Sequence, residues 1–542
     1  MIFKNKKKQL QENFGQRPHT MYFDGDMARI QAHYNFRCEQ KLDEFLIDDI
    51  TWHDLSMDDL FKQINTRLTT SGEQYLYYLL RSPTLDQSEY EKRYALIKFM
   101  EDHPDLRLKL QVIFSKLGRK RDVKLHENFV SVHRKYWKLM LYLFLSMTLL
   151  LLPIVGFLIW RENPILPLLF IAQLIFNILF HMYITRGIEY ELQTVNYILG
   201  MVASAKKIKK LDLTQVGSHF KKFNASVNRL KSLNGIAFSI EDGKGEQVKD
   251  ELTMVFTYIL NKLFFVDLIA FELVKNKLGK YHQEIFYIHE TIGSLDASIA
   301  IASYRAGLNS YSLPTINFSN HEERCLKITD VVHPLVKEPI SNSIDTRMPI
   351  LLTGSNASGK STFLRSVTMN MIMAQSICTV LAKNYEASAF YIYSSMAIAD
   401  NLLAGDSYFI AEIKSMKRIV DAISIKRPTF CVIDEILRGT NTIERISASS
   451  ELLKLIADKN ALCFAATHDI ELCELLKQDY RMLHFTESIT ASGEVAFDYL
   501  LREGPARTRN AIKLLEALGF DNTLVNAANE RASRYIEQGR WV

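Results

Sequence analysis

The sequence predicts a two-part fold: a mainly α-helical region carrying a two-helix transmembrane hairpin, followed by an α/β domain with a mixed or mostly parallel sheet. One basis is a glycine-rich phosphate-binding pattern after residue 353, placed between an apolar strand and a helix. Another is a pair of uncharged apolar runs, at 139–160 and 165–184, each long enough to cross a bilayer. Helical apolar spacing elsewhere in the first 330 residues completes the prediction.

Composition describes a folded protein of several domains. The chain has 542 residues, of which 48% are hydrophobic and 23% charged. A net charge of +5 is small for this length and does not by itself indicate nucleic-acid binding. The six cysteines show no C-x-x-C spacing, which favours reduced core thiols over a metal site. The N-terminus is basic and polar, so we expect a solvated tail there rather than a signal peptide.

The phosphate-binding pattern lies in Leu351–Ser366, LLTGSNASGKSTFLRS, and has the form G-x-x-x-x-G-K-S. Its glycines let backbone N–H groups turn toward phosphate oxygens, and the following helix adds its positive end. The lysine supplies a full positive charge, and the serine hydroxyl after it can hold Mg²⁺. The residues predicted to bind nucleotide here are Gly354, Ser355, Asn356, Ala357, Ser358, Gly359, Lys360, Ser361 and Thr362.

Two later apolar strands end in residues suited to nucleotide hydrolysis. Thr429–Glu435 reads TFCVIDE, so Asp434 is expected to hold Mg²⁺ and Glu435 to deprotonate the attacking water. Leu462–His468 reads LCFAATH, and His468 is expected to sense the γ-phosphate. A further segment, NLLAGDSYFIAEI at 401–413, could open a helix and present Ser407 to phosphate, although an ordinary loop has the same composition.

Four stretches together resemble the MutS family of mismatch-repair ATPases. They read GSNASGKSTFLRS, DNLLAGDSYFIAEI, VIDEILRGTNT and AATHDIELCELL. The resemblance implies an ABC-class ATPase that uses ATP and Mg²⁺ and acts as a homodimer, with Ser407 completing the partner's site. It also implies that Arg438–Thr442 crosses the dimer interface. The chain departs from the family pattern at Tyr408, Leu437, Glu444 and Arg445.

Weaker resemblances extend over most of the chain outside the apolar runs. Residues 46–93 are similar to the helical core of MutS, Ile292–Leu308 to its lever helix, and Tyr499–Phe520 to its C-terminal dimerisation helices. Core-like helices begin near residue 40, so we expect no mismatch-recognition domain with its Phe-x-Glu wedge. By resemblance alone, the protein is expected to bind DNA without reading mismatches.

The two apolar runs predict a membrane hairpin. Arg134, Lys135, Lys138 and Arg186 flank it, so the positive-inside rule places the N- and C-terminal parts in the cytoplasm, with only the turn at 161–163 outside. The second run carries three polar residues on one helical face, which we interpret as contacts between the two helices: Gln173, Asn177 and His181. An ion path, or two core helices of a soluble protein, are the alternatives.

The predicted organisation has six parts and leaves two function classes open. A basic cluster at Lys206–Lys210 could meet anionic lipid, DNA phosphate or only solvent. The protein is therefore either a membrane-tethered DNA-handling ATPase or a membrane-anchored ATP-driven switch acting on protein partners. The parts are a basic N-terminal segment (1–35), a helical core-like region (36–138), the hairpin (139–184), a helical lever-like region (185–324), the ATPase domain (325–505) and the dimerisation helices (506–542).

Overall fold

The chain folds into two compact units, one helical and one α/β. The helical unit comprises Met1–Leu42, Ile64–Tyr78 and Ala95–Ala306, and the α/β unit comprises the remaining segments. The structure is a computed structural model. It describes residues 2–18, 21–23, 25–66, 68–120, 123, 125, 137–159, 165–213, 217, 219–230, 259–260, 262–319, 324–355, 358–396, 408–423, 427–489, 495–506, 512 and 519–538.

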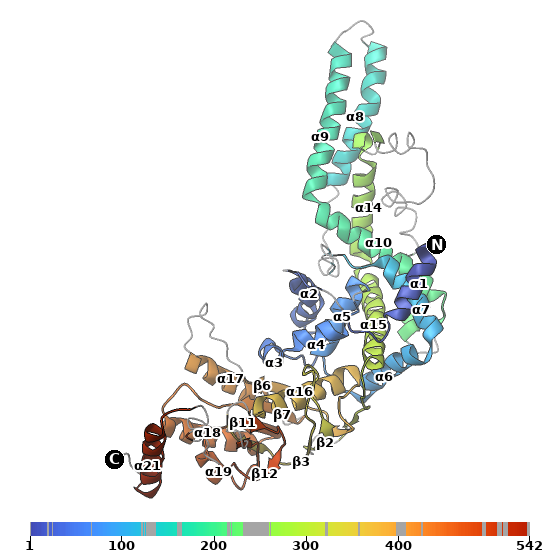
Figure 1. The fold of residues 1–542 in the computed structure, drawn as a ribbon. Helices are drawn as coiled ribbons and strands as arrows, with labels where there is room; N and C mark the ends of the chain where they lie inside the picture. The colour runs from blue at the N-terminus through green and yellow to red at the C-terminus, as the bar shows by residue number, and fades with distance from the viewer. Residues whose placement is uncertain are drawn as a thin grey trace. The chain divides into compact units, whose positions relative to one another are not determined.

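The helical unit is built around α15, the helix that contains most of the predicted lever segment. Five α15 residues spaced three or four apart are fully buried and place one long face in the core: Ile285, Ile288, Ile292, Leu295 and Ile299. The helices of this unit are α1 (Ile2–Glu12), α2 (Asp26–Glu39), α7 (Pro104–Leu117), α8 (Trp137–Ile159), α9 (Ile165–Gly187), α10 (Glu189–Lys209), α11 (His219–Arg229), α14 (Val266–Lys280) and α15 (His282–Ala306) (Figure 1). Two further helices, α5 (Thr70–Arg81) and α6 (Gln87–Asp102), continue from one unit into the other.

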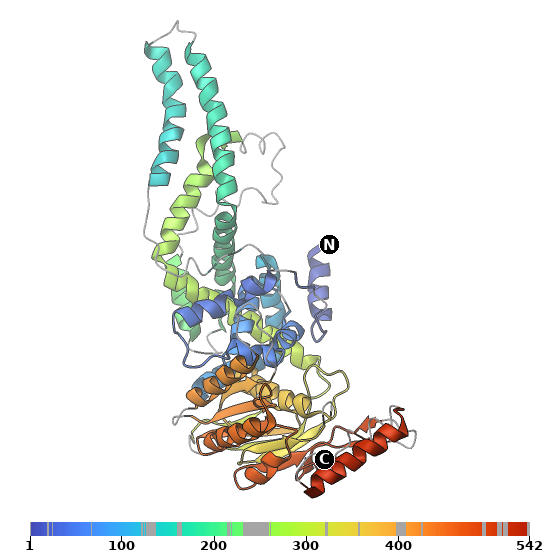
Figure 2. The same ribbon diagram turned by 90° about the vertical axis from the view of Figure 1, so that its left-hand side faces the viewer.

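Helices α8 and α9 cover the two apolar runs and lie side by side (Figures 1 and 2). Within the described residues, Pro167–Gly187 is long and apolar enough to span a membrane, and Trp137–Leu151 is a shorter apolar helix. The turn expected at 161–163, Trp160, Arg134 and Lys135 lie outside the described residues. The large apolar side chains point outward from both helices, as Met140 (70% exposed) and Leu168 (67% exposed) illustrate.

The three polar residues of α9 do share one face, but that face contacts more than α8. Gln173 donates to Thr148 of α8 over 3.4 Å. Asn177 instead contacts the segment that leads into α14, and His181 contacts Asp267 in the first turn of α14. The interpretation that all three join the two hairpin helices is therefore correct only for Gln173.

The α/β unit contains a six-stranded sheet in the order β12-β9-β4-β8-β7-β6, in which every neighbouring pair is parallel except β12 and β9. A four-stranded sheet (β1-β5-β2-β3) and the pair β10-β11 complete it. The strands are β1 (Thr315–Asn317), β2 (Leu326–Val331), β3 (Asn342–Thr346), β4 (Ile350–Thr353), β5 (Asn384–Ser388), β6 (Tyr391–Ser395), β7 (Thr429–Asp434), β8 (Ala461–Ala466), β9 (Arg481–His484), β10 (Glu487–Ile489), β11 (Val495–Phe497) and β12 (Arg502–Glu503).

Helices bury both faces of the large sheet, which is why its central strands read as unbroken apolar runs. Every residue of β4 and β8 is buried. Cys431 and Ile433 of β7 face α17, α18 and α19, whereas Phe430 packs on Phe464 on the other face. The helices here are α3 (Asp49–Asp54), α4 (Met57–Ile64), α16 (Lys360–Ile377), α17 (Tyr408–Ala422), α18 (Thr442–Ala457), α19 (Glu471–Leu475) and α21 (Asn522–Gln538).

Two early segments, 43–63 and 79–94, belong to the α/β unit rather than to the helical one. Buried polar contacts hold the first in place. The Asp54 carboxylate accepts from the Ser394 hydroxyl at 2.6 Å and from the Met396 N–H at 2.9 Å, and its carbonyl accepts from Arg365. The prediction that both segments belong to the helical core-like region is therefore wrong, because helical spacing does not indicate which core a helix joins.

Candidate functional site

Three neighbouring parallel strands, β4, β8 and β7, bring the predicted site residues to one edge of the sheet. Their registers align Leu352 with Ala466, and Ala466 with Asp434. Residues that follow these strands therefore meet: the phosphate-binding loop after β4, Glu435 after β7, and His468 after β8. Active sites of open α/β sheets form at this carboxyl edge of the strands.

The phosphate-binding loop connects β4 to α16, as predicted, and its two glycines hold backbone conformations that other residues avoid. Gly354 has φ +140° and Gly359 has φ +111°. A Cβ atom at Gly354 would lie 2.6 Å from the Phe485 carbonyl oxygen, so a side chain there requires the backbone to move. Asn356 and Ala357, also predicted to bind nucleotide, lie outside the described residues.

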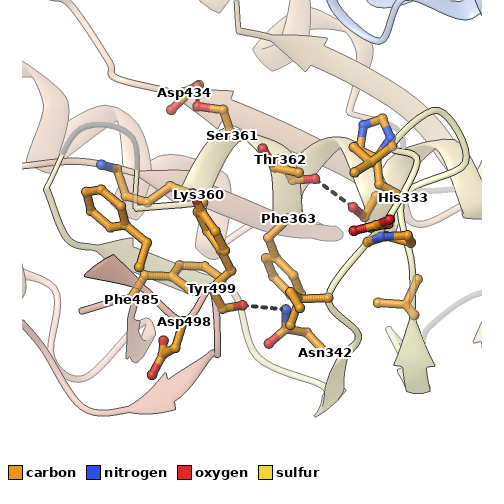
Figure 3. A pocket seen from close by; sticks show the side chains of 18 of the residues that line it. His333, Asn342, Lys360, Ser361, Thr362, Phe363, Asp434, Phe485, Asp498 and Tyr499 are labelled. Atoms are coloured by element: carbon orange, nitrogen blue, oxygen red, sulfur yellow. Dashed lines mark hydrogen bonds between the residues drawn. The ribbon is translucent and has the colours of Figure 1, made fainter. Parts of the chain in front are cut away.

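Lysine, serine and aspartate side chains converge beside this loop (Figure 3). The Lys360 ammonium donates to the carbonyls of Gly354 and Ser355, both at 2.8 Å. The Ser361 hydroxyl donates to the Asp434 carboxylate over 2.5 Å. Burial raises the pKa of Asp434, and the bond from Ser361 opposes that rise.

The residues present fit a magnesium nucleotide. A hydroxyl and a carboxylate on adjacent elements form the oxygen donor set that Mg²⁺ prefers when phosphate supplies further ligands. Among the residues that the structure describes, the buried Ser358 hydroxyl oxygen has no hydrogen-bond partner, which leaves it for a group placed in the loop. Thr362 lines the adjoining pocket.

Glu435 lies between an imidazole and a guanidinium group at the edge of the site. Its carboxylate is 3.4 Å from His468 Nδ1 and 2.8 Å from the Arg438 guanidinium. The hydrogen bond with His468 lowers the pKa of Glu435 and raises the pKa of His468. Near neutral pH Glu435 is therefore ionised and can accept a proton.

A pocket of about 790 Å³ adjoins these groups, and the sequence analysis missed most of its wall. Phe485 and Tyr499 line one side, and Asn342 donates to the Tyr499 carbonyl over 3.0 Å (Figure 3). His333 lines it too, and burial lowers the pKa of His333 to about 4, so the ring is neutral. These residues come from short edge elements without a contiguous motif; only the position of Phe485 directly after a strand was a usable signal.

The structure shows what the residues that depart from the family pattern contact and how they are held. Glu444 accepts from the Thr440 hydroxyl at 2.8 Å, and Arg445 binds Asp469 through two bonds of 2.9 and 2.6 Å. Leu437 is buried and has φ +55°, a conformation in which glycine is favoured. Ser407 lies outside the described residues, and the side chain of Tyr408, at the start of α17, does too.

Comparison with known proteins identifies the α/β unit. The family model for MutS domain V matches residues 350–535, which include the phosphate-binding loop, Glu435 and His468. Residues 350–535 therefore form a MutS-family domain. The DNA mismatch repair protein MutS of Listeria welshimeri is 27% identical over 286 residues, 50% of this chain and 32% of that protein. MutS of Streptococcus agalactiae is 29% identical over 276 residues, 49% of this chain and 31% of that protein.

This similarity covers part of each protein. The aligned region spans about a third of the length of these MutS relatives. What carries over without further argument is the MutS-type domain, which follows a helical N-terminal region as the sequence predicted.

Proposed function

We propose that this MutS-family protein is an ATPase that hydrolyses ATP to ADP and phosphate. Lys360 and the loop N–H groups bind the phosphates, and Ser361 and Asp434 hold Mg²⁺, which neutralises charge on the β- and γ-phosphates. Glu435 takes a proton from water as the water oxygen bonds to the γ-phosphorus and the bond to the β-phosphate oxygen breaks. His468 orients Glu435 through their contact and senses the γ-phosphate.

The main support is the meeting of the Ser361–Asp434 pair with Lys360 and Glu435 at one sheet edge. An ion pair with a purely structural role could also place an acid near a lysine. Such an ion pair would not need the two glycines with positive φ that this loop contains. The pocket walled by Phe485 and Tyr499 is the place we assign to the nucleoside part.

The test separates nucleotide binding from water activation. Lys360→Ala should lose ATP binding, because the remaining loop carries no full charge for the phosphates. Glu435→Gln should still bind ATP but turn it over at least 100-fold more slowly, the order of a lost general base. Binding would be followed with a fluorescent ATP analogue and turnover by phosphate release. Wild-type turnover by Glu435→Gln would show that another group accepts the proton.

We further propose that the protein works as a homodimer in which Ser407 reaches the partner's γ-phosphate and Arg438–Thr442 lies at the interface. The support is the family resemblance of these two segments. Mixing Lys360→Ala subunits with Ser407→Ala subunits tests it. A shared site predicts that the mixture forms some interfaces with one intact composite site, so turnover should rise above that of either variant alone.

We propose that α8 and α9 tether the protein to a membrane as a two-span hairpin, with both termini cytoplasmic. The support is the outward-facing apolar surface of both helices combined with buried polar residues on the inner face of α9. Asn177 and His181 have no exposed surface, whereas Leu179 on the same helix is 61% exposed. A water-soluble helix has the opposite arrangement, and contiguous apolar surface of this kind marks contact with lipid or protein.

We propose that ATP hydrolysis drives an action on DNA that does not involve mismatch recognition. The support is the similarity to MutS proteins. The alternative, a switch that acts on protein partners, is favoured by the contacts that join the hairpin to α14, which leads into α15. Binding of the intact protein in detergent to duplex DNA, with and without a G·T mismatch, distinguishes the two. A DNA-binding protein loses affinity steeply with salt, whereas a protein switch shows no such binding.

A further inference from the structure

A third chain segment packs into the base of the hairpin. Residues 262–264 are helical, the backbone breaks at Phe265 with φ +52°, and α14 begins at Val266. Phe265 is fully buried, and its ring stacks on Tyr142 of α8 and on His181 of α9. In both views the start of α14 lies alongside the two hairpin helices (Figures 1 and 2).

Both hairpin helices hydrogen-bond the backbone just before this break. The Ser146 hydroxyl of α8 donates to the Phe264 carbonyl over 2.7 Å. The Asn177 amide of α9 donates to the Leu263 carbonyl over 2.9 Å. Carbonyls that an interrupted helix leaves without partners thus find them inside the protein. Irregular backbone is tolerated at membrane depth only under that condition.

The charged groups of the segment pair with His181 of the hairpin, which is fully buried, although the Asp267 side chain keeps 31% of its surface exposed. The Asp267 carboxylate lies 2.8 Å from His181 Nε2, and the Lys262 ammonium lies 3.2 Å from His181 Nδ1. Apolar residues of the same segment point outward: Ile259 is 44% exposed and Val266 is 40% exposed. Charges that are paired within the protein, beside exposed apolar side chains, fit a membrane-embedded element.

These contacts fix the depth of the segment relative to the hairpin. Asn177 and His181 lie ten and six residues before Gly187, the cytoplasmic end of the candidate span, or about 15 and 9 Å along the helix. Their partners Leu263 and Asp267 lie at the same levels. A hydrocarbon core is about 30 Å thick, so this depth reaches from the cytoplasmic boundary toward the midplane.

Charged residues return on all three elements at one common level. Lys138 at the start of α8 and Lys275 of α14 both interact electrostatically with Glu272. Lys275 also forms an ion pair with Glu191, which lies in the first turn of α10, the helix that follows α9. This level is the natural boundary between lipid and water for all three elements.

We propose that residues 259–260 and 262–268, here called the third arm, insert into the cytoplasmic leaflet beside the hairpin and contact lipid acyl chains through Ile259 and Val266. The inference rests on the proposed membrane tether. It adds an element within the leaflet that connects the bilayer through α14 to α15. Movement of α15 would then shift an element held within the leaflet.

The experiment places an environment-sensitive fluorophore at single cysteines in the full-length protein. The background carries Cys38→Ser and Cys325→Ser, since the other four cysteines are buried. The test positions are Ile259→Cys and Val266→Cys. Leu179→Cys reports the hairpin, and Tyr190→Cys, 62% exposed at the start of α10, reports the aqueous side. All four side chains are exposed, so labelling leaves the packing intact.

The labelled proteins would be reconstituted in phosphatidylcholine–phosphatidylglycerol vesicles and quenched from the lipid by nitroxide-labelled acyl chains or from the water by iodide. Positions 259, 266 and 179 should lose most of their emission to the lipid quencher and little to iodide, and position 190 should do the reverse. Lipid quenching at 179 with iodide quenching at 259 and 266 would overturn the third arm and leave the tether standing. Iodide quenching at 179 as well would overturn both.

Discussion

At the scale of single residues, the loop after Glu435 combines strain with packing. Glu435 and Leu437 have φ +60° and +55°, in the left-handed region that costs a residue with a side chain about 1–2 kcal/mol. Leu437 nevertheless keeps only 5% of its surface exposed and belongs to the core shared by β7, β8 and α18. The two effects oppose each other when this position is changed.

We predict that Leu437→Gly destabilises the protein, but less than Leu437→Ala does. Removing a buried leucine side chain costs about 2–5 kcal/mol, which exceeds the strain that glycine relieves. Alanine loses nearly the same packing and keeps the strain, so it should be less stable than glycine by about 1 kcal/mol. The measurement is the urea midpoint of the α/β unit in the detergent-solubilised full chain. At a position with ordinary φ the order would be reversed, so glycine less stable than alanine would contradict the argument.

At the scale of elements, α15 is attached to the start of α5 by a buried carboxylate. Thr69 caps α5, because its hydroxyl accepts from the Gly72 N–H at 2.8 Å. Asp296 of α15 holds this capping residue, accepting from the Thr69 N–H at 3.0 Å and from the Thr69 hydroxyl at 2.6 Å. A Cβ atom at Gly72 would lie 2.0 Å from the same carboxylate. Glycine at this position is what allows the two helices to approach. Burial raises the pKa of Asp296 to about 7.

We predict that Asp296 makes stability fall as pH rises from 4 to 7. The folded protein keeps this proton up to a pKa of about 7, whereas the unfolded chain releases it near 3.8, so rising pH favours unfolding over that window. The full effect is on the order of 4 kcal/mol. Asp296→Asn should lack it. The measurement is the free energy of unfolding of both proteins between pH 4 and 8. Parallel pH profiles for the two would show that Asp296 does not titrate there.

At the scale of the whole molecule, the apolar surface of α8 and α9 determines whether the protein partitions into a membrane or into water. Phe144, Leu151, Ile175 and Phe176 are all about half exposed, on helices long enough to enter a bilayer. Each apolar side chain of this size moved from water into hydrocarbon contributes roughly 1.5–3 kcal/mol. Because many such side chains act together, the free energy of inserting them into lipid exceeds any electrostatic attraction between weak surface charges and the membrane.

We predict that the intact protein sediments with membranes and resists extraction at alkaline pH, which removes proteins held only by charge. Deleting 139–184 should make most of the protein extractable, because only the shorter third arm then remains in contact with lipid. The measurement is the fraction recovered in the supernatant after carbonate treatment. Recovery of the intact chain in the soluble fraction without detergent would refute the tether.

The chain's local patterns predicted the order of the two parts, the strand–loop–helix context of Gly354–Ser361, and the positions of Glu435 and His468 directly after apolar strands. Contiguous motifs and strand periodicity carry such features, because each depends on residues close together in the chain. The apolar runs within 139–184 likewise predicted the two helices that the structure contains there.

Only the tertiary structure decided which distant residues meet. Segments 43–63 and 79–94 have ordinary helical spacing, and their place in the α/β unit depends on contacts such as Asp54 with Ser394, 340 residues apart. The same holds for Asn342 beside Tyr499 and for Asn177 and His181 beside residues 263–267. In each case a polar group is satisfied by a partner far along the chain, and no local periodicity records which partner that is.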